Sequence, residues 1–289
     1  MTVFLHYDQA ALDRQYDQRA WAPNAAEVIR RYAVNSDLAR ARLGEPQSCK
    51  YGPSGAETLD LYSSGQAQAP LHVFIHGGAW RLLSKRESAF AAEMFVRAGA
   101  HFAALDFALL PAASLAVMAA QVRRAIVWLY QNAQTIGADR ERIYISGHSS
   151  GAHLAALAAV TDWPRQYGLP AGIVKGALCA SGIYDLAPVR LSARNEYLRL
   201  DDELEQTLSP QRHLDRLGCD LIIAFADGDS DEFRRQAESF ARSAGARARL
   251  LEAKCLNHFE LAEMLADPDG LLGGAALAQM GLSTDGQPA

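Results

Sequence analysis

The chain has 289 residues, of which 49% are apolar, enough to form one sizeable hydrophobic core. It carries 28 Lys and Arg against 33 Asp and Glu, and this net charge of −5 argues against nucleic acid or an anionic membrane as its main partner. No apolar run approaches the ~20 residues of a membrane-spanning helix, and the N-terminal residues lack the basic and apolar regions of a secretory signal. We therefore expect one cytoplasmic domain over residues 1–289 that acts on a small molecule; the oligomeric state is left open.

The N-terminal part of the chain predicts helices and then a strand. Residues 8–20 and 24–43 have helical periodicity with polar residues interspersed, so we expect an N-terminal helical arm within residues 1–45. Residues 57–62 alternate polar and apolar side chains, which is typical of a strand with one exposed face. The polar residues 63–70 then predict a surface turn.

A buried strand over residues 71–76 runs into His76-Gly77-Gly78. Paired glycines let backbone amides turn inward without side-chain clashes. In α/β serine hydrolases a loop of this kind, upstream of the nucleophile, supplies backbone donors to the oxyanion hole. We assign this hole to the amides of Gly77, Gly78 and Ser150; a plain glycine turn after a strand is the alternative.

The segment Gly147-His148-Ser149-Ser150-Gly151 follows a predicted strand over residues 141–146 and opens an Ala- and Leu-rich helix over 149–160. This order is that of the nucleophile elbow, whose tight turn lifts a serine clear of the sheet. Gly147 and Gly151 allow strand and helix to pass closely, and the helix start directs amides at the reacting carbonyl. We predict that Ser149 is the nucleophile, against the alternative of a serine in an ordinary strand-to-helix turn.

The base and its acid are expected further along the chain, in the order Ser, Asp or Glu, His. His258 lies beyond the acidic loop that follows a strand over residues 219–226, and no other histidine does, so we predict it as the base. The acid is ambiguous among Asp227, Asp229 and Asp231. The position a few residues past the strand end suits a loop acid best, so we choose Asp229, with Asp227 as the second choice.

The remaining elements alternate as in α/β folds. They are helices near 85–98, 114–134, 231–244, 259–265 and 271–280, and strands over 101–107, 173–180 and 247–253. The polar, Arg-rich residues 188–217 have little strand character and predict an inserted helical cap. Strands separated by helices imply an α/β fold with a mainly parallel central sheet covered by helices on both faces. Its catalytic loops would converge at the carboxyl edge of the sheet.

The other reactive side chains are expected to be structural. His76 and His148 are expected to make hydrogen bonds around the loops, and His153 to pack within its helix. The four cysteines have no paired spacing, which indicates free thiols in a reducing compartment: Cys49, Cys179, Cys219 and Cys255.

Several of these segments resemble the kynurenine formamidases (arylformamidases) of the α/β-hydrolase fold. They are residues 76–80 (His-Gly-Gly-Ala-Trp), 147–154, 181–186, 229–236 and 257–260, and residues 13–16 and 51–62 are similar too, so the resemblance covers most of the chain. The resemblance implies a triad of Ser149, Asp229 and His258, which selects Asp229 as the acid. Three departures leave that triad intact: Ser150 stands where Ala is usual, Asp231 where Pro is common, and residues 107–111 are less polar.

The resemblance also implies a reaction. Ser149 would attack the formyl carbonyl of N-formyl-L-kynurenine and release L-kynurenine and formate, with no metal or organic cofactor. Trp80 and Tyr184 are candidate walls for the aromatic leaving group, against a packing role. Asn195 and Arg194 are candidates to reach the substrate carboxylate from the cap, although a solvated role is expected for Arg194. A carboxylesterase of short acyl esters and a non-catalytic binding module are the competing interpretations.

Overall fold

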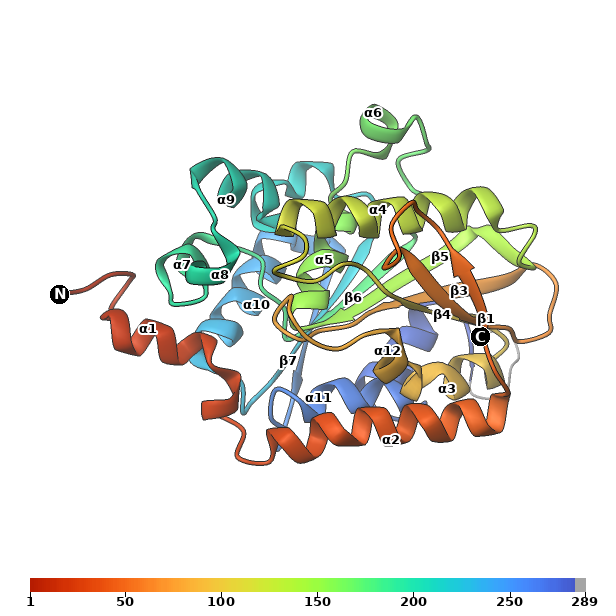
Figure 1. The fold of residues 1–289 in the computed structure, drawn as a ribbon, viewed down its shortest axis with the longest axis horizontal. Helices are drawn as coiled ribbons and strands as arrows, with labels where there is room; N and C mark the ends of the chain where they lie inside the picture. Colours follow the sequence, from red (N-terminus) through yellow and green to blue (C-terminus); the bar gives the residue numbers. More distant parts are fainter. Residues whose placement is uncertain (284–289) are drawn as a thin grey trace.

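The computed structural model describes residues 1–283. Their strands form one eight-stranded sheet in the order β1-β2-β4-β3-β5-β6-β7-β8, and helices pack around it (Figure 1). The strands are β1 (Gln47–Lys50), β2 (Thr58–Tyr62), β3 (Ala69–Ile75), β4 (His101–Leu105), β5 (Ala138–His148), β6 (Gly176–Ala180), β7 (Asp220–Ala226) and β8 (Ala248–Ala253). β2 pairs with β1 and β4 in antiparallel fashion, and every other pairing is parallel. The predicted α/β-hydrolase fold is confirmed.

Helices cover both faces of the sheet, and the side chains of β3 divide between the two cores. Leu71, Val73 and Ile75 belong to the core shared with α4 (Leu115–Asn132), α5 (Ser150–Ala159) and α10 (Asp231–Ala244). Phe74 belongs to the opposite core, with α2 (Ala25–Leu43), α3 (Ala92–Arg97) and α12 (Leu271–Gln279). Because alternate residues of a strand point to opposite faces and both faces are covered, this central strand is buried throughout.

The remaining helices are short. They are α1 (Gln9–Tyr16), α6 (Trp163–Tyr167), α7 (Ala187–Leu191), α8 (Asn195–Leu198), α9 (Asp202–Leu208) and α11 (Glu260–Glu263), with 3₁₀ turns η1 (Gln18–Ala20), η2 (Lys85–Ala91), η3 (Pro210–Arg212), η4 (Leu214–Arg216), η5 (Gly245–Arg247) and η6 (Met264–Ala266). Among the helices of residues 1–283, none combines the length and apolar character needed to cross a membrane.

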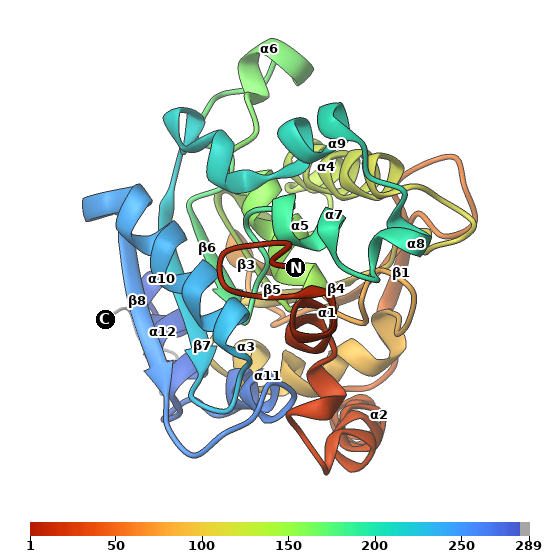
Figure 2. The same cartoon turned by 90° about the vertical axis from the view of Figure 1, so that its left-hand side faces the viewer.

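The N-terminal residues separate into two parts. α2 runs alongside η2 beneath the sheet, whereas α1 contacts α7 and α10 at the opposite end of the arm (Figure 2). The backbone N–H of Ala193, between α7 and α8, donates to Asp13 of α1 at 2.6 Å. The segment before α2 is therefore attached directly to the helices of the predicted cap, which cover the carboxyl edge of the sheet.

The prediction of one exposed face for residues 57–62 is wrong. Glu57 and Asp60 are 1% and 9% exposed, although both carry charge. Glu57 pairs with Arg124 of α4, and Asp60 pairs with Lys85 at 2.8 Å. Burial of a carboxylate is costly unless it is paired and hydrogen-bonded, and these two partners lie far away in the sequence, so the alternating pattern did not reveal them.

Candidate active site

The loop at Ser149 has the backbone geometry of a sharp strand-to-helix turn. Ser149 joins β5 to α5 with φ 56° and ψ −120°, a conformation that residues with a Cβ rarely adopt. A Cβ on Gly147 would lie 2.3 Å from the carbonyl oxygen of Gly151, and one on Gly151 would lie 2.1 Å from that of Ile75. Both distances are far below contact, so only glycine permits β3, β5 and α5 to meet here.

His258 lies within hydrogen-bonding distance of both Ser149 and Asp229. His258, in the loop after β8, has its Nε2 3.0 Å from Ser149 Oγ and its Nδ1 2.6 Å from Asp229 Oδ1. The three side chains are 6%, 2% and 1% exposed respectively. With Nδ1 donating to the carboxylate, Nε2 of a neutral imidazole is left free to accept the serine proton.

Asp229 remains ionised in spite of its burial. Burial alone would raise its pKa, but the charge of His258 and hydrogen bonds from His258, Ser181 and the Ala226 amide outweigh it and leave the pKa below its usual value. The Ser181 hydroxyl donates to Oδ2 at 2.5 Å and the amide of Ala226 at 2.9 Å. Both donors hold Oδ2 while Oδ1 accepts from His258, so the carboxylate is fixed against the imidazole.

The other two candidate acids have different partners. Asp227 accepts hydrogen bonds from the amides of Cys255 and Leu256, which fixes the loop that leads to His258. Asp231 lies in the first turn of α10 and pairs with Arg234. Neither is hydrogen-bonded to His258, so the geometry favours Asp229 over both.

The loop after β3 lies against the elbow. Gly78, Ala79 and Trp80 have φ values of 102°, 54° and 59°, so three consecutive residues adopt left-handed conformations. The amides of Arg81 and Leu82 donate to the Gly78 carbonyl, which closes the turn.

Ser150 and Gly77 connect this loop to the nucleophile. Ser150 Oγ accepts from the Trp80 amide at 3.2 Å. A Cβ on Gly77 would lie 3.4 Å from that of Ser149. Gly77, Gly78 and Ser150 are thus all beside the nucleophile, and their amides remain the predicted oxyanion donors.

Of the three histidines near the elbow, His148 and His153 are kept neutral by burial. Burial lowers the pKa of His148 to about 3 and that of His153 to about 4. His148 Nε2 contacts the carbonyl oxygen of His258, and His153 Nε2 that of Leu208. His76 Nδ1 is 2.8 Å from the Gly77 carbonyl oxygen. These are the structural roles expected from the sequence.

Ser149 and His258 open into a cavity of about 590 Å³. Its walls come from the segment around α1, from α2, from the loops after β3 and β4, and from the cap. They include apolar and aromatic side chains and four charged ones: Tyr16, Ile29, Tyr32, Leu82, Leu83, Leu110, Pro111, Tyr197 and Phe259, with Asp17, Arg19, Arg81 and Arg194. A cavity with these dimensions and an apolar majority accommodates a small aromatic molecule.

Both predicted aromatic walls, Tyr184 and Trp80, are wrong. Tyr184 is fully buried, stacks on Phe240 with ring centroids 4.3 Å apart, and lies in the core under α10. Trp80 is 1% exposed and packs edge-on against His153 beneath the loop. Neither lines the cavity. Both residues adjoin catalytic motifs in the sequence, but their side chains point into the core.

Asn195 is also misassigned, and Arg194 was underrated. The Asn195 side chain bonds both the amide and the carbonyl of Leu200 and so closes its own turn, away from the cavity. Arg194 is half-buried and lines the cavity, contrary to the expected solvated role. Tyr16, Tyr32 and Tyr197 were missed altogether, because no local motif marks residues brought to the site by the arm and the cap.

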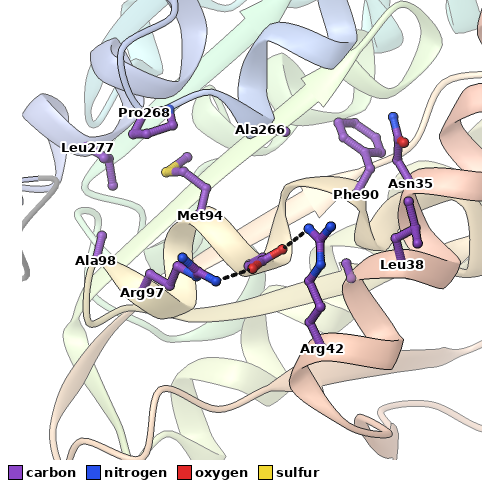
Figure 3. A pocket seen from close by; sticks show the side chains of 12 residues that line it. Asn35, Leu38, Arg42, Phe90, Met94, Arg97, Ala98, Ala266, Pro268 and Leu277 are labelled. Carbon is purple, nitrogen blue, oxygen red and sulfur yellow. Dashed lines mark hydrogen bonds and ion pairs between the residues drawn. The ribbon is translucent and has the colours of Figure 1, made fainter.

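A second cavity, of about 490 Å³, lies between α2, α3 and the C-terminal helices (Figure 3). Two arginines on its wall, Arg42 and Arg97, both pair with Glu93, as the dashed lines in the figure show. Both arginines therefore already have an acidic partner within the protein. Within residues 1–283 no group of three or more His, Cys, Asp or Glu side chains is arranged to hold a metal ion.

Comparisons with known proteins agree with this geometry. A family model described as BD-FAE matches residues 59–175. Kynurenine formamidase of Danio rerio is 37% identical over 288 residues, which cover 94% of this chain and 96% of that protein, and the enzyme of Salmo salar is 35% identical with the same coverage. A solved structure from Silicibacter sp. TM1040, described as a candidate thioesterase, superposes with a TM-score of 0.81 over 92% of this chain and 98% of that one at 23% identity, and shows the shared fold.

Proposed function

The chain belongs to the kynurenine formamidase family and is an arylformamidase-like hydrolase, and we propose that it cleaves N-formyl-L-kynurenine to L-kynurenine and formate through Ser149. The observation that carries this proposal is the continuous hydrogen-bonded series from Ser149 through His258 to Asp229, opening into an aromatic-lined cavity. The sequence identity of 37% and 35% between this chain and two kynurenine formamidases, over nearly their whole length, supports the formamide as substrate.

The first half of the reaction forms an acyl-enzyme. His258 Nε2 takes the proton of Ser149 as Oγ attacks the formyl carbon, and the Asp229 carboxylate stabilises the resulting imidazolium. Negative charge develops on the carbonyl oxygen, and the amides of Gly77, Gly78 and Ser150 would donate to it. One such donor is typically worth about 3–4 kcal/mol of transition-state stabilisation.

Collapse of this intermediate breaks the C–N bond. The protonated His258 gives its proton to the departing aryl amine, which leaves as the product amine, and Ser149 remains as a formyl ester. Water then attacks this ester with His258 as the base again. Formate leaves and the serine regains its proton, so each turnover consumes one water and no other reactant.

The cavity is suited to the leaving group. Tyr16, Tyr32, Tyr197 and Phe259 supply aromatic surface that can pack against an aryl ketone. The formyl group is the smallest acyl group, so little room is needed between Ser149 and the loop at Gly78. These features support an aryl formamide of this size as the substrate.

The test is product formation by the purified protein. Incubation with N-formyl-L-kynurenine should release L-kynurenine, followed by its absorbance, and an equal amount of formate, followed by a coupled formate dehydrogenase assay. The Ser149→Ala variant should retain its fold and release neither. Equal rates of hydrolysis by the Ser149→Ala variant and the wild type would overturn the proposal, and so would a wild type that releases no L-kynurenine. If the wild type hydrolyses only short acyl esters, the protein is a carboxylesterase instead.

A further inference from the structure

The cavity at Ser149 carries an excess of positive charge. Arg19, Arg81 and Arg194 line it, and among the residues that the structure describes only Asp17 adds an acidic side chain to its wall. The whole chain, in contrast, has a net charge of −5. A local charge opposite to that of the whole protein favours an anionic ligand, because a recessed site concentrates the field of its own groups.

None of these three arginines forms an ion pair within residues 1–283. The second cavity shows the opposite arrangement, since Glu93 there pairs with both Arg42 and Arg97 (Figure 3). Arginines at the catalytic cavity therefore keep their capacity to bind a carboxylate, which matches the planar guanidinium in geometry and charge.

Of the three, Arg194 is held in place. Its Nε and Nη2 donate to the carbonyl oxygen of Tyr16 at 3.0 and 2.5 Å. Its guanidinium carbon lies 5.7 Å from the ring centroid of Tyr16 and 5.9 Å from that of Trp80. Arg81 and Arg19 are exposed, and Arg81 rests on the ring of Tyr197 alone. A fixed cation loses less conformational entropy when it binds a ligand than a mobile one does.

The remaining nitrogen of Arg194, Nη1, is buried and has no hydrogen-bond partner. A buried charged donor without an acceptor is unfavourable, and proteins rarely leave one in that state. Arg194 also lies beside Trp80, whose amide is bonded to Ser150 of the elbow. The unpaired donor therefore belongs to a residue that borders both the cavity and the loop at the nucleophile.

From these observations we infer that Arg194 binds the carboxylate of the substrate's amino-acid chain, so that the cavity selects aryl formamides with an anionic leaving group. This inference rests on the proposed function and names the residue that gives it specificity. The substrate is then held at two points, the formyl carbon at Ser149 and the carboxylate at Arg194. Arg194 contacts the substrate far from the reacting bond, so its loss should raise KM more than it lowers kcat.

The test compares N-formyl-L-kynurenine with its methyl ester, in which a methyl group removes the carboxylate charge, and formate release is followed for both. Wild type should prefer the acid at least tenfold in kcat/KM. Arg194→Met should lower kcat/KM for the acid about 30-fold, mainly through KM, and change that for the methyl ester less than threefold. Arg194→Lys, which keeps the charge, should recover part of the loss. Arg190→Met, which removes a cap arginine paired with Glu205 outside the cavity, is the matched control for cap stability and should affect neither substrate.

A second measurement separates this inference from the proposed function. In the Ser149→Ala background, the Kd of L-kynurenine, measured by calorimetry, should rise at least tenfold on Arg194→Met, while that of its methyl ester should not change. If wild type hydrolyses neither formamide, the proposed function fails, and this binding experiment alone decides the role of Arg194. Equal losses on acid and ester in either experiment would show that Arg194 is structural, and no effect on both would show that it does not bind the carboxylate. Either result would overturn the inference.

Discussion

His148 Nε2 lies 2.8 Å from the carbonyl oxygen of His258, so the residue before the nucleophile is bonded to the backbone of the base. The two imidazole rings are 4.8 Å apart. Since burial keeps His148 neutral, with its pKa lowered to about 3, its Nε2–H donates to that carbonyl. The elbow and the loop after β8 are therefore connected directly, and His148 positions His258 without being required to transfer a proton itself.

Removal of this bond should slow the chemistry. His148→Phe should lower kcat about tenfold, about 1.4 kcal/mol, with little change in KM, because His258 is less well oriented toward Ser149. His148→Asn, which retains an N–H donor, should lose less. Steady-state kinetics on the same substrate, with circular dichroism as a control for folding, measures both. Full activity in His148→Phe would contradict the positioning role.

The acid can be identified by single substitutions. Asp229→Asn should lower kcat by several orders of magnitude, about 10⁴ for the equivalent change in serine proteases, because the amide favours the wrong imidazole tautomer. Asp231→Asn should be nearly neutral. Asp227→Asn should reduce activity only modestly, through the loop that it holds. A larger loss in Asp227→Asn than in Asp229→Asn would show that the acid is misassigned.

The loop after β3 can be tested at Gly78. Gly78 has φ 102°, and a Cβ on it would lie 2.1 Å from the carbonyl oxygen of Leu82. Gly78→Ala should therefore displace the loop and lower kcat by about 10²–10³, the usual cost of one lost oxyanion donor. Gly55→Ala is the control, because a Cβ at Gly55 meets nothing within 4 Å. Similar kinetics for both variants would remove Gly78 from the oxyanion hole.

Stability should fall on mild acidification. Burial lowers the pKa of His148 and His72 to about 3 and that of His153 to about 4, whereas an unfolded histidine titrates near 6.5. Between these values the unfolded state binds more protons, so the free energy of unfolding decreases as the pH falls below about 6.5 and levels off below the folded pKa values.

His153 alone should account for about 2 kcal/mol between pH 7 and 5. Denaturant unfolding at several pH values should therefore give a shallower pH dependence for His153→Gln than for wild type. His6→Gln, at an exposed position, is the control and should leave the slope unchanged. An unchanged slope in His153→Gln would mean that His153 does not resist protonation.

The sequence predicted those parts of the molecule that local chemistry determines. The order of strand, Gly-x-Ser-x-Gly and helix requires a sharp turn, and the contacts that a Cβ on Gly147 or Gly151 would make explain why. Alternating strands and helices gave the parallel sheet, although β1 and the helix α6 carried too little periodicity to be predicted. The helix expected at 85–98 begins as the 3₁₀ turn η2 and becomes α-helical only at Ala92.

The walls of the cavity were not predictable in the same way. Tyr184 and Asn195 have the right chemistry for a substrate site. However, the ring of Tyr184 stacks on Phe240, and the Asn195 side chain bonds the backbone of Leu200. Tyr16 and Arg194, 178 positions apart, meet because α1 docks on the cap. Such partners depend on tertiary contacts between distant segments, which neither periodicity nor motif spacing encodes.

The central claim is that this chain is built for a formamide with a large leaving group rather than for activated esters. A formamide has a poorer leaving group than a phenyl ester, so rapid cleavage requires remote contacts as well as the triad. The direct test is kcat/KM for N-formyl-L-kynurenine against p-nitrophenyl acetate, measured on one preparation of the purified protein without added metal. We predict a ratio of at least about ten in favour of the formamide, about 1.4 kcal/mol in transition-state binding. A clear preference for the ester, with formylkynurenine cleaved barely above background, would contradict the account.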